Sequence, residues 1–533
     1  MINTIESQTD KAIVIGAGFG GLAAAIRLAA LGLKVTVIEA AATPGGKARA
    51  LPSVAGPVDA GPTVLTLRSV FDALFALNGE RLDDHIGLIR QPVLARHWWP
   101  GSDRLDLTPD ADANTEAIRA LAGPREAAAF RRFDQMAQGL FDAFDAPMMQ
   151  AARPDRAAIA RAALRQPRLW PALLPGMTLD RLLRLHFRDP RLIQLFGRYA
   201  TYVGGRPAQS PAVLALIWRA EAAGVWAVEG GLHRLAAALA ALAERMGVQF
   251  QFNTSASRIQ RQNGHVTGVQ IAGGRSLPCG LCVFNGDPAA LTKGLLGDAA
   301  QAAIPAASTQ PRSLSALVWA FAATPFGPVA RDLIHHNVIF TADPAAEFGP
   351  ISRGQMPEAP TLYLCAEDRA AVTATGPDSG PASRPERFEI IINAPAGLPA
   401  RPEDYARCRT RTFDRLSQMG LQFDTPPDAS SLTTPSQLDR LFPASQGAIY
   451  GRSPEGLMAA FQRPLARTAL PGLYLAGGGA HPGAGVPMAA LSARHAAEAI
   501  MQDRISASRS APTAMPGGTS MASHRMGPAR SRS

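Results

Sequence analysis

A glycine-rich turn near the start of the chain constrains the fold more than any other stretch of the sequence. A short apolar run over residues 13–15 comes before it, an Ala- and Leu-rich stretch over 22–31 follows it, and a second apolar run over 35–38 comes next. The turn itself carries three glycines in the spacing G-x-G-x-x-G, at Gly16, Gly18 and Gly21. This order predicts a buried strand, a tight turn, a helix and a parallel strand.

Each glycine of the turn has a distinct role in a dinucleotide-binding unit. Gly16 makes the turn, Gly18 lets a pyrophosphate approach the backbone, and Gly21 lets the helix pack closely on the strand. The free N–H groups and the dipole at the helix N-terminus favour the anion. Glu39, which ends the second apolar run, can accept hydrogen bonds from the ribose hydroxyls. We therefore predict a dinucleotide site rather than a purely structural turn.

A second glycine pair follows the acid. Residues 45–49 read Gly-Gly-Lys-Ala-Arg, which resembles the second fingerprint of the FAD-dependent amine-oxidase-like superfamily. The resemblance implies that Gly46, Lys47 and Arg49 approach the FAD pyrophosphate from the side opposite the first turn. Simple NAD dehydrogenases lack this continuation, so FAD is favoured over NAD as the cofactor. The alternative is a basic glycine loop in solvent.

The composition is that of a folded protein with more than one domain. At 533 residues the chain exceeds the usual size of a single core, and 47% of its residues are hydrophobic. Its four cysteines give no disulfide framework and fit a reducing compartment. Cys279 and Cys282 form a C-x-x-C without a second pair or a histidine at zinc spacing, so we expect small buried residues of a strand.

We also predict no metal site at His335 and His336. Adjacent side chains on an extended segment point to opposite faces, so the two rings should not chelate one ion.

Charge and hydropathy limit the location of the protein. The first ten residues are polar and carry acids, which predicts no signal peptide, and no apolar run reaches the roughly eighteen residues that a spanning helix needs. We expect a cytoplasmic protein, bound peripherally to the cytoplasmic face of the inner membrane. The formal charge is +10, and residues 503–533 should form a disordered basic tail. Nothing else in the sequence supports binding to nucleic acid.

Two further blocks carry a more specific resemblance. Residues 58–66 read VDAGPTVLT, and residues 472–487 read GLYLAGGGAHPGAGVP. Both resemble blocks of the bacterial phytoene-desaturase type of carotenoid desaturases. In the first block, the resemblance implies that Pro62 and Thr63 lie near the flavin ring.

The second block is predicted to hold the flavin end of the cofactor. The resemblance places Gly478, Gly485 and Val486 there. A helix that begins at about Gly485 would point its free N–H groups at the negative charge of the reduced flavin. Ala480 stands where many relatives have Thr, so no hydroxyl role is assigned to it.

The resemblance spans about residues 11 to 500 and implies an α/β fold. A Rossmann-type FAD-binding domain is expected to interleave with an α+β substrate domain, which combines a mixed sheet with a helical region. The FAD-binding domain should consist of residues 11–90, 226–289 and 446–502. The substrate domain should consist of residues 91–225 and 290–445.

Two segments of the substrate domain each allow two interpretations. His97, Trp98 and Trp99 lie in a predicted hairpin over 93–108, where the tryptophans are either core packing or the wall of an apolar substrate tunnel. Residues 153–198 are rich in Arg, with Leu and Trp interleaved. Such a segment is either a membrane-interface surface or a set of solvated helices with apolar faces in the core.

Within the family, the sequence is most similar to the desaturases that act on 1-hydroxycarotenoids at the 3,4 position, in the spheroidene and spirilloxanthin pathways of purple bacteria. The segments that carry this similarity are GPVDAGPTVLTLRSVFDALFA, ARHWWPG, RYATYVGG and GVWAVEGGLHRLAAALAALA. Two alternatives stay open: a phytoene desaturase, which acts earlier, and a non-catalytic lipid-binding protein of the GDP-dissociation-inhibitor kind.

The resemblance also implies the partners of the reaction. The substrate would be a hydrophobic carotenoid, and the electron acceptor would be a quinone or oxygen. No general base is identified, and we expect structural roles for Asp59, His97 and His481.

Overall fold

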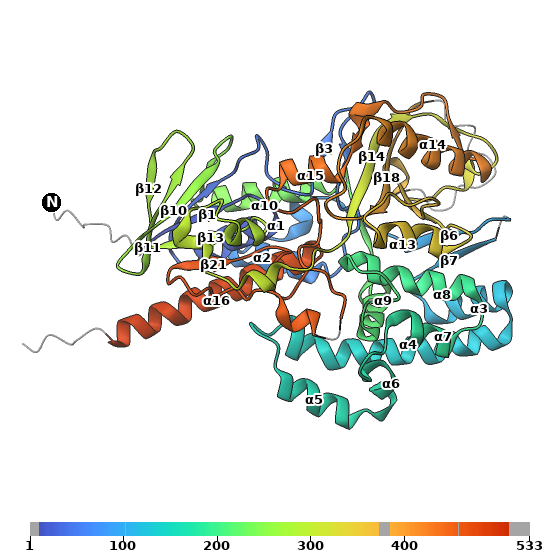
Figure 1. Ribbon diagram of the computed structural model, residues 1–533, viewed down its shortest axis with the longest axis horizontal. Coiled ribbons are helices and arrows are strands. Elements are labelled where there is room, and N and C mark those ends of the chain that lie inside the picture. Colours follow the sequence, from blue (N-terminus) through green and yellow to red (C-terminus); the bar gives the residue numbers. More distant parts are fainter. Residues whose placement is uncertain (1–9, 102, 372–383, 457, 511–533) are drawn as a thin grey trace, which may run out of the picture.

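The computed structural model describes residues 10–101, 103–371, 384–456 and 458–510. Two units share the chain, one on the left and one on the right of Figure 1.

The first unit is built on a five-stranded sheet whose paired strands all run parallel, in the order β21–β13–β1–β2–β9. Successive side chains point to opposite faces, so Val14 joins one buried cluster and Ile13 another. Because both faces are covered, β1 is apolar along most of its length. The strands are β1 (Lys11–Ile15), β2 (Lys34–Ile38), β9 (Gln249–Gln251), β13 (Leu281–Phe284) and β21 (Leu473–Leu475).

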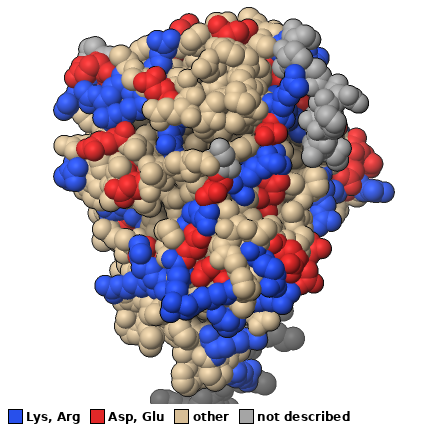
Figure 2. Space-filling view, turned by 90° about the vertical axis from the view of Figure 1, so that its right-hand side faces the viewer, with Lys and Arg blue, Asp and Glu red and all other residues tan. Residues whose placement is uncertain are grey.

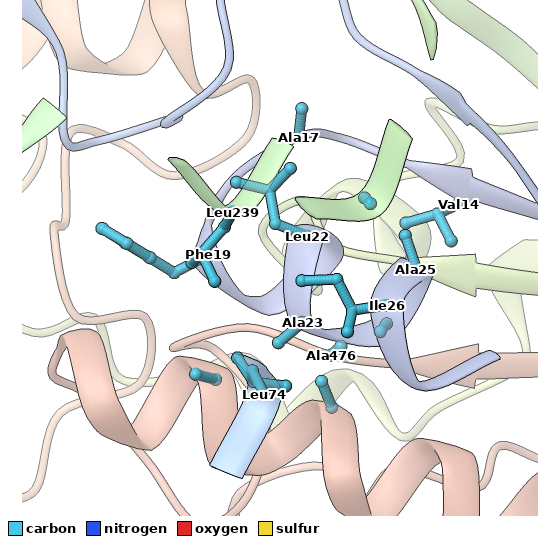
Figure 3. Packing of buried hydrophobic residues seen from close by; sticks show 14 of the residues in the cluster. Val14, Ala17, Phe19, Leu22, Ala23, Ala25, Ile26, Leu74, Leu239 and Ala476 are labelled. Carbon is cyan, nitrogen blue, oxygen red and sulfur yellow. The ribbon is translucent and has the colours of Figure 1, made fainter. Parts of the chain in front are cut away.

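Helices cover one face of this sheet and a small second sheet covers the other. Figure 3 shows side chains of α1 in one buried cluster with Leu74 of α2 and Leu239 of α10. The opposite face packs on a three-stranded antiparallel sheet, whose first hairpin turns at Asn263 and Gly264, both with positive φ. The elements are α1 (Phe19–Ala30), α2 (Ser69–Phe75), α10 (His233–Arg245), α16 (Val486–Ser510), β10 (Ala256–Gln262), β11 (His265–Ile271) and β12 (Ser276–Pro278).

The second unit is built on a seven-stranded mixed sheet, in the order β20–β14–β18–β17–β16–β6–β7. One face, with Trp319 and Phe388, packs against α14. The other face carries Tyr363 and Ile391 in register, and β4 packs across part of it. The elements are β4 (Val58–Asp59), β6 (Ala95–Trp98), β7 (Arg104–Leu107), β14 (Ser315–Ala323), β16 (His336–Ile339), β17 (Leu362–Ala366), β18 (Glu386–Ala394), β20 (Leu432–Thr433) and α14 (Pro402–Gln418).

A helical region lies below this sheet in the view of Figure 1. Its core is aromatic, with Phe130, Phe196 and Trp218 in contact. Lys and Arg side chains gather over the lower part of the molecule in Figure 2. Among the described residues, no helix is both long and apolar enough to cross a bilayer. The helices are α3 (Ala111–Ala122), α4 (Pro124–Phe144), α5 (Arg156–Arg165), α6 (Trp170–Leu173), α7 (Leu179–His186), α8 (Pro190–Gly197) and α9 (Leu216–Ala222).

One expected boundary is wrong. The basic tail was predicted to start at residue 503, but α16 continues to Ser510. Asp503 explains the extension, because its carboxylate accepts hydrogen bonds from Arg467 at 2.8 Å and from the Tyr474 hydroxyl at 2.8 Å. The rest of the predicted tail lies outside the described residues.

The remaining strands and α-helices are β3 (Ala50–Leu51), β5 (Leu88–Arg90), β8 (Trp226–Val228), β15 (Pro325–Phe326), β19 (Gln422–Phe423), α11 (Ala289–Thr292), α12 (Asp298–Gln301), α13 (Pro344–Ser352) and α15 (Pro435–Leu441).

Candidate functional site

The glycine turn leads from β1 into α1 and has room for backbone only. Gly16 has a φ of +98°, a left-handed value that favours glycine. A Cβ atom on Gly18 would lie 2.9 Å from Nδ2 of Asn285, and one on Gly21 would overlap the carbonyl oxygen of Gly16. No side chain caps the first N–H groups of α1. An uncapped helix N-terminus behind a bare turn suits an anion such as a pyrophosphate.

The second glycine loop lies beside the first. The N–H of Gly45 donates to the carbonyl oxygen of Ala17 at 2.9 Å, and a Cβ on Gly46 would come 3.1 Å from Cα of Gly18. Glu39 directly follows β2 at the same place, and its carboxylate accepts a hydrogen bond from the N–H of Ala17 at 2.6 Å. A carboxylate has further acceptor positions, so Glu39 fits the predicted ribose contact. The two loops form a cradle that side chains would fill.

The two basic residues of this loop form hydrogen bonds with a later part of the chain. Lys47 donates to the carbonyl oxygen of Ile449 at 2.6 Å and lies 5.5 Å from the ring centre of Phe442. Arg49 donates to the hydroxyl of Thr433. Burial lowers the pKa of Lys47 to about 8, and it also lowers the pKa of Arg49. A nearby anion would stabilise both charges, and their contact with the pyrophosphate stays a prediction.

The closing block sets the start of α16. The helix begins at Val486, directly after Gly485, as the sequence predicts. Arg463 fixes the loop before it by donating to the carbonyl oxygens of Gly478 at 3.0 Å and Tyr450 at 3.1 Å. Gly485 and Val486 both line a large cavity, so the N-terminal end of α16 faces that cavity.

This cavity has a volume of about 1100 Å³. It is large beside ordinary small-molecule sites of roughly 300–1000 Å³. The predicted flavin loop contributes Pro62 and Thr63 to its wall, at a place where the sheet of the second unit and the helical region also meet. Most of the wall is apolar, and it includes Val64, Phe141, Phe144, Met148, Ile193, Val213, Leu214, Leu216, Ile217, Val338, Phe340 and Ile391. The shape and chemistry suit a bulky hydrocarbon.

The wall also carries polar groups beside the flavin loop. The Tyr363 hydroxyl lies 2.7 Å from the hydroxyl of Thr63 and 2.5 Å from Nδ1 of His336. On the wall of the same cavity, Arg198 and Glu221 form a buried ion pair at 3.0 Å. Sequence reasoning missed this group, because its members are far apart in the chain.

The tryptophans of the predicted hairpin have different surroundings. Core packing is observed for both of them, and contact with a substrate stays a prediction. Trp98 packs in the core of the second unit, on the face covered by α14. Trp99 lines the cavity and stacks on Phe340, with ring centres 5.1 Å apart. Trp99 therefore belongs to the apolar wall.

The three residues for which structural roles are expected all make structural contacts. Asp59 accepts a hydrogen bond from Nδ1 of His233 at 2.7 Å. Nδ1 of His97 bonds the carbonyl oxygen of Leu105, and Nε2 of His481 bonds that of Ala151. Burial lowers the pKa of His97 well below its usual range and that of His481 to about 4.

The expectation that His335 and His336 diverge is wrong. Their ring centres lie 4.3 Å apart, because His335 precedes β16 and does not follow its alternation. The ligand atoms of both rings and of Cys365 lie within 4.8 Å of one another, a spacing that could hold a metal ion. Nδ1 of His335 already bonds the carbonyl oxygen of Ala366, and burial raises the pKa of the Cys365 thiol. The absence of a metal here stays a prediction.

Asn285 is a second feature that sequence reasoning missed. It directly follows β13, and its Nδ2 donates to the carbonyl oxygen of Gly16 at 3.3 Å. The signal was present, because polar residues at the carboxyl ends of neighbouring parallel strands meet at the ligand-binding edge.

Comparison with known proteins agrees with this geometry. Residues 19–322 match the family described as flavin containing amine oxidoreductase. The chain is 64% identical to a hydroxyneurosporene desaturase of Cereibacter sphaeroides, over 94% of this chain and 99% of that protein. It is 59% identical to one of Rhodobacter capsulatus, over 95% of this chain and 100% of that protein. A 1-hydroxycarotenoid 3,4-desaturase of a Flavobacterium species is 27% identical, over 92% of this chain and 99% of that protein.

Solved structures share the fold. A putrescine oxidase variant superposes with a TM-score of 0.58 at 13% identity, over 92% of this chain and 99% of that one. The bare turn, the uncapped N-terminus of α1 and the adjoining glycine loop fit FAD. The chain therefore belongs to the flavin-containing amine oxidoreductase family, as an FAD-dependent carotenoid desaturase of the phytoene-desaturase type.

Proposed function

We propose that this protein introduces a C=C bond at the 3,4 position of a 1-hydroxycarotenoid, in the pathway that leads to spheroidene or spirilloxanthin. The observation that carries the proposal is the cavity of about 1100 Å³, whose apolar wall meets Pro62, Thr63, Gly485 and Val486. The names of the similar desaturases support the hydroxylated substrate.

The chain itself binds and orients the polyene. When bound, FAD supplies the two-electron oxidation that turns a CH2–CH2 unit into CH=CH. The apolar wall excludes water and holds the hydrocarbon with few polar contacts. The free N–H groups at the start of α16 stabilise negative charge at the cavity edge. Gly485 before this helix keeps side chains out of that space.

The proposal extends to the surface by which a lipid-soluble substrate reaches the cavity. α5 and α6 lie at the lower edge of the molecule in Figure 1. Leu164 is 72% exposed, Trp170 49% and Leu174 51%, beside exposed arginines. Leu182, Leu183 and Phe187 of the same Arg-rich segment are buried in the core. The peripheral contact with the cytoplasmic face of the inner membrane is therefore assigned to α5 and α6, and not to the buried leucines of α7.

The test uses purified holoenzyme with liposomes that contain either a 1-hydroxycarotenoid or phytoene. We expect the hydroxycarotenoid product to be lighter by two hydrogens and to absorb at longer wavelength, and phytoene to remain unchanged. Oxygen and a quinone are supplied in turn as electron acceptors. Turnover of phytoene alone would identify the earlier desaturase instead. A protein that holds carotenoid but converts neither substrate with any acceptor would belong to the lipid-binding class.

A further inference from the structure

We infer that the polar group on the cavity wall, formed by Thr63, Arg198, Tyr202, Glu221 and Tyr363, binds the tertiary hydroxyl of the carotenoid and so selects hydroxylated substrates. This inference rests on the proposed function and specifies how it is achieved. All five residues line the cavity.

The centre of this hydroxyl subsite is an ion pair that is almost fully buried. The side chains of Arg198 and Glu221 are 6% and 4% exposed, with Nη2 and Oε2 3.0 Å apart. The Tyr202 hydroxyl donates to Oε1 of Glu221 at 3.0 Å, and the Arg198 guanidinium lies 4.9 Å from the centre of the Tyr202 ring. Nε of Arg198 is buried and has no hydrogen-bond partner among the described residues.

Such a group is unfavourable beside a pure hydrocarbon. A buried ion pair is weak evidence of stability, because desolvation offsets its attraction. A hydroxyl offers one donor and two acceptor positions. It can therefore hydrogen-bond the remaining acceptor positions of the Tyr202 and Tyr363 hydroxyls on the cavity wall, which a hydrocarbon end cannot. Sites built in this way reject analogues that lack the hydroxyl.

The covalent distance between the hydroxyl and the reacting carbons restricts where the subsite must lie. The oxygen on C1 is three bonds from C3, at most about 4 Å. The hydroxyl subsite must therefore lie next to the predicted flavin loop. Thr63 belongs to that loop, and its hydroxyl lies 2.7 Å from that of Tyr363. Arg198, Tyr202 and Glu221 line the same cavity as Thr63 and Tyr363.

A second polar group in the same cavity lies farther along the strands. Oε2 of Glu347 accepts a hydrogen bond from Thr361 at 2.6 Å, and Oε1 accepts one from Asn393 at 2.8 Å. Thr361 precedes Tyr363 by two residues, about 7 Å along an extended chain. That separation exceeds the reach from C3 to the hydroxyl, so the group at Tyr363 is preferred.

The experiment compares Tyr202→Phe and Tyr363→Phe with a matched control, Tyr199→Phe. Tyr199 also bonds the carboxylate of Glu221, but it is fully buried and does not line the cavity. The measurement is the preference, given by kcat/KM for a 1-hydroxycarotenoid divided by kcat/KM for the same carotenoid without the hydroxyl. Flavin content and melting temperature verify the fold of each holoenzyme.

We expect each cavity variant to lower the preference about tenfold, the effect of one lost hydrogen bond of about 1.4 kcal/mol, and Tyr199→Phe to leave it unchanged. If the wild-type enzyme prefers the hydroxylated substrate and the cavity variants keep this preference, the subsite is overturned but the proposed function is not. Thr361→Val tests the second polar group. If this variant loses the preference while the two tyrosine variants of the cavity keep it, the subsite at Tyr363 is overturned as well. Wild-type enzyme without a preference refutes the proposed function and the subsite together.

Discussion

At the residue scale, space rather than backbone conformation excludes a side chain at Gly18. Its φ of −73° is open to any residue, so backbone conformation does not require glycine there. The requirement is steric, because a Cβ would lie 2.9 Å from Asn285, between two backbone loops.

Gly18→Val is therefore expected to abolish flavin binding, with an affinity loss of at least about tenfold, or 1.4 kcal/mol. The added side chain occupies the space of the pyrophosphate. The measurement is the flavin absorbance of the purified protein after reconstitution with FAD. Ala30→Val is the matched control, since Ala30 is exposed at the far end of α1. Near-normal flavin occupancy in Gly18→Val would refute the site.

At the scale of elements, two stacked histidines link α16 and the loop before it to the segment that follows α4. His481 and His495 lie with ring centres 5.7 Å apart, and they bond the carbonyl oxygens of Ala151 and Met149. Burial lowers the pKa of each histidine to about 4. Burial therefore favours the neutral form of both imidazoles in the folded chain.

This depression of the two pKa values predicts acid sensitivity. Between about pH 6.5 and pH 4 the unfolded chain binds protons that the folded chain does not, so the free energy of unfolding falls as the pH falls. The loss is at most about 3 kcal/mol per histidine by pH 4. His495→Gln should reduce the drop in melting temperature between pH 7.5 and pH 5, while exposed His265→Gln should not. An unchanged drop in His495→Gln would contradict the assignment.

The length of α16 gives another prediction at this scale. A chain ended after Ser510 keeps every described contact of α16 and should match the full chain in flavin content and turnover. A chain ended after Gln502 lacks Asp503, so Arg467 and the buried Tyr474 hydroxyl lose their hydrogen bonds to its carboxylate. We expect the free energy of unfolding to fall by on the order of 1 kcal/mol. Thermal unfolding of both chains measures the difference, and equal melting temperatures would show that residues 503–510 add no stability.

At the scale of the whole molecule, the proposed peripheral membrane contact rests on the position of α5 and α6 at the lower edge in Figure 1. Leu164→Glu replaces the most exposed of their apolar side chains and should weaken binding to anionic liposomes about tenfold, as expected for one buried leucine. Leu31→Glu is the control, because Leu31 is exposed in the first unit. Flotation at low and high salt measures binding, and salt should weaken it. Wild-type protein that stays unbound at low salt would contradict the proposal.

The sequence determined the features that depend on neighbours along the chain. The spacing of Gly16, Gly18 and Gly21 between apolar runs is a local pattern, and the strand, turn and helix form where it predicts them. The start of α16 after Gly485 is local in the same sense. The resemblance of the two end blocks then identified the family, which the comparisons confirm.

Only the tertiary structure decided which distant side chains meet. Thr63 and Tyr363 are 300 positions apart and share a hydrogen bond, and Arg49 reaches Thr433 rather than a local partner. The rings of His335 and His336 converge because one precedes the strand that holds the other. Such contacts follow from strand order and helix packing, which arise from many weak interactions over the whole core and leave no spacing in the sequence. The glycine turn therefore follows from neighbouring residues in the sequence, whereas the cavity exists only in the folded chain.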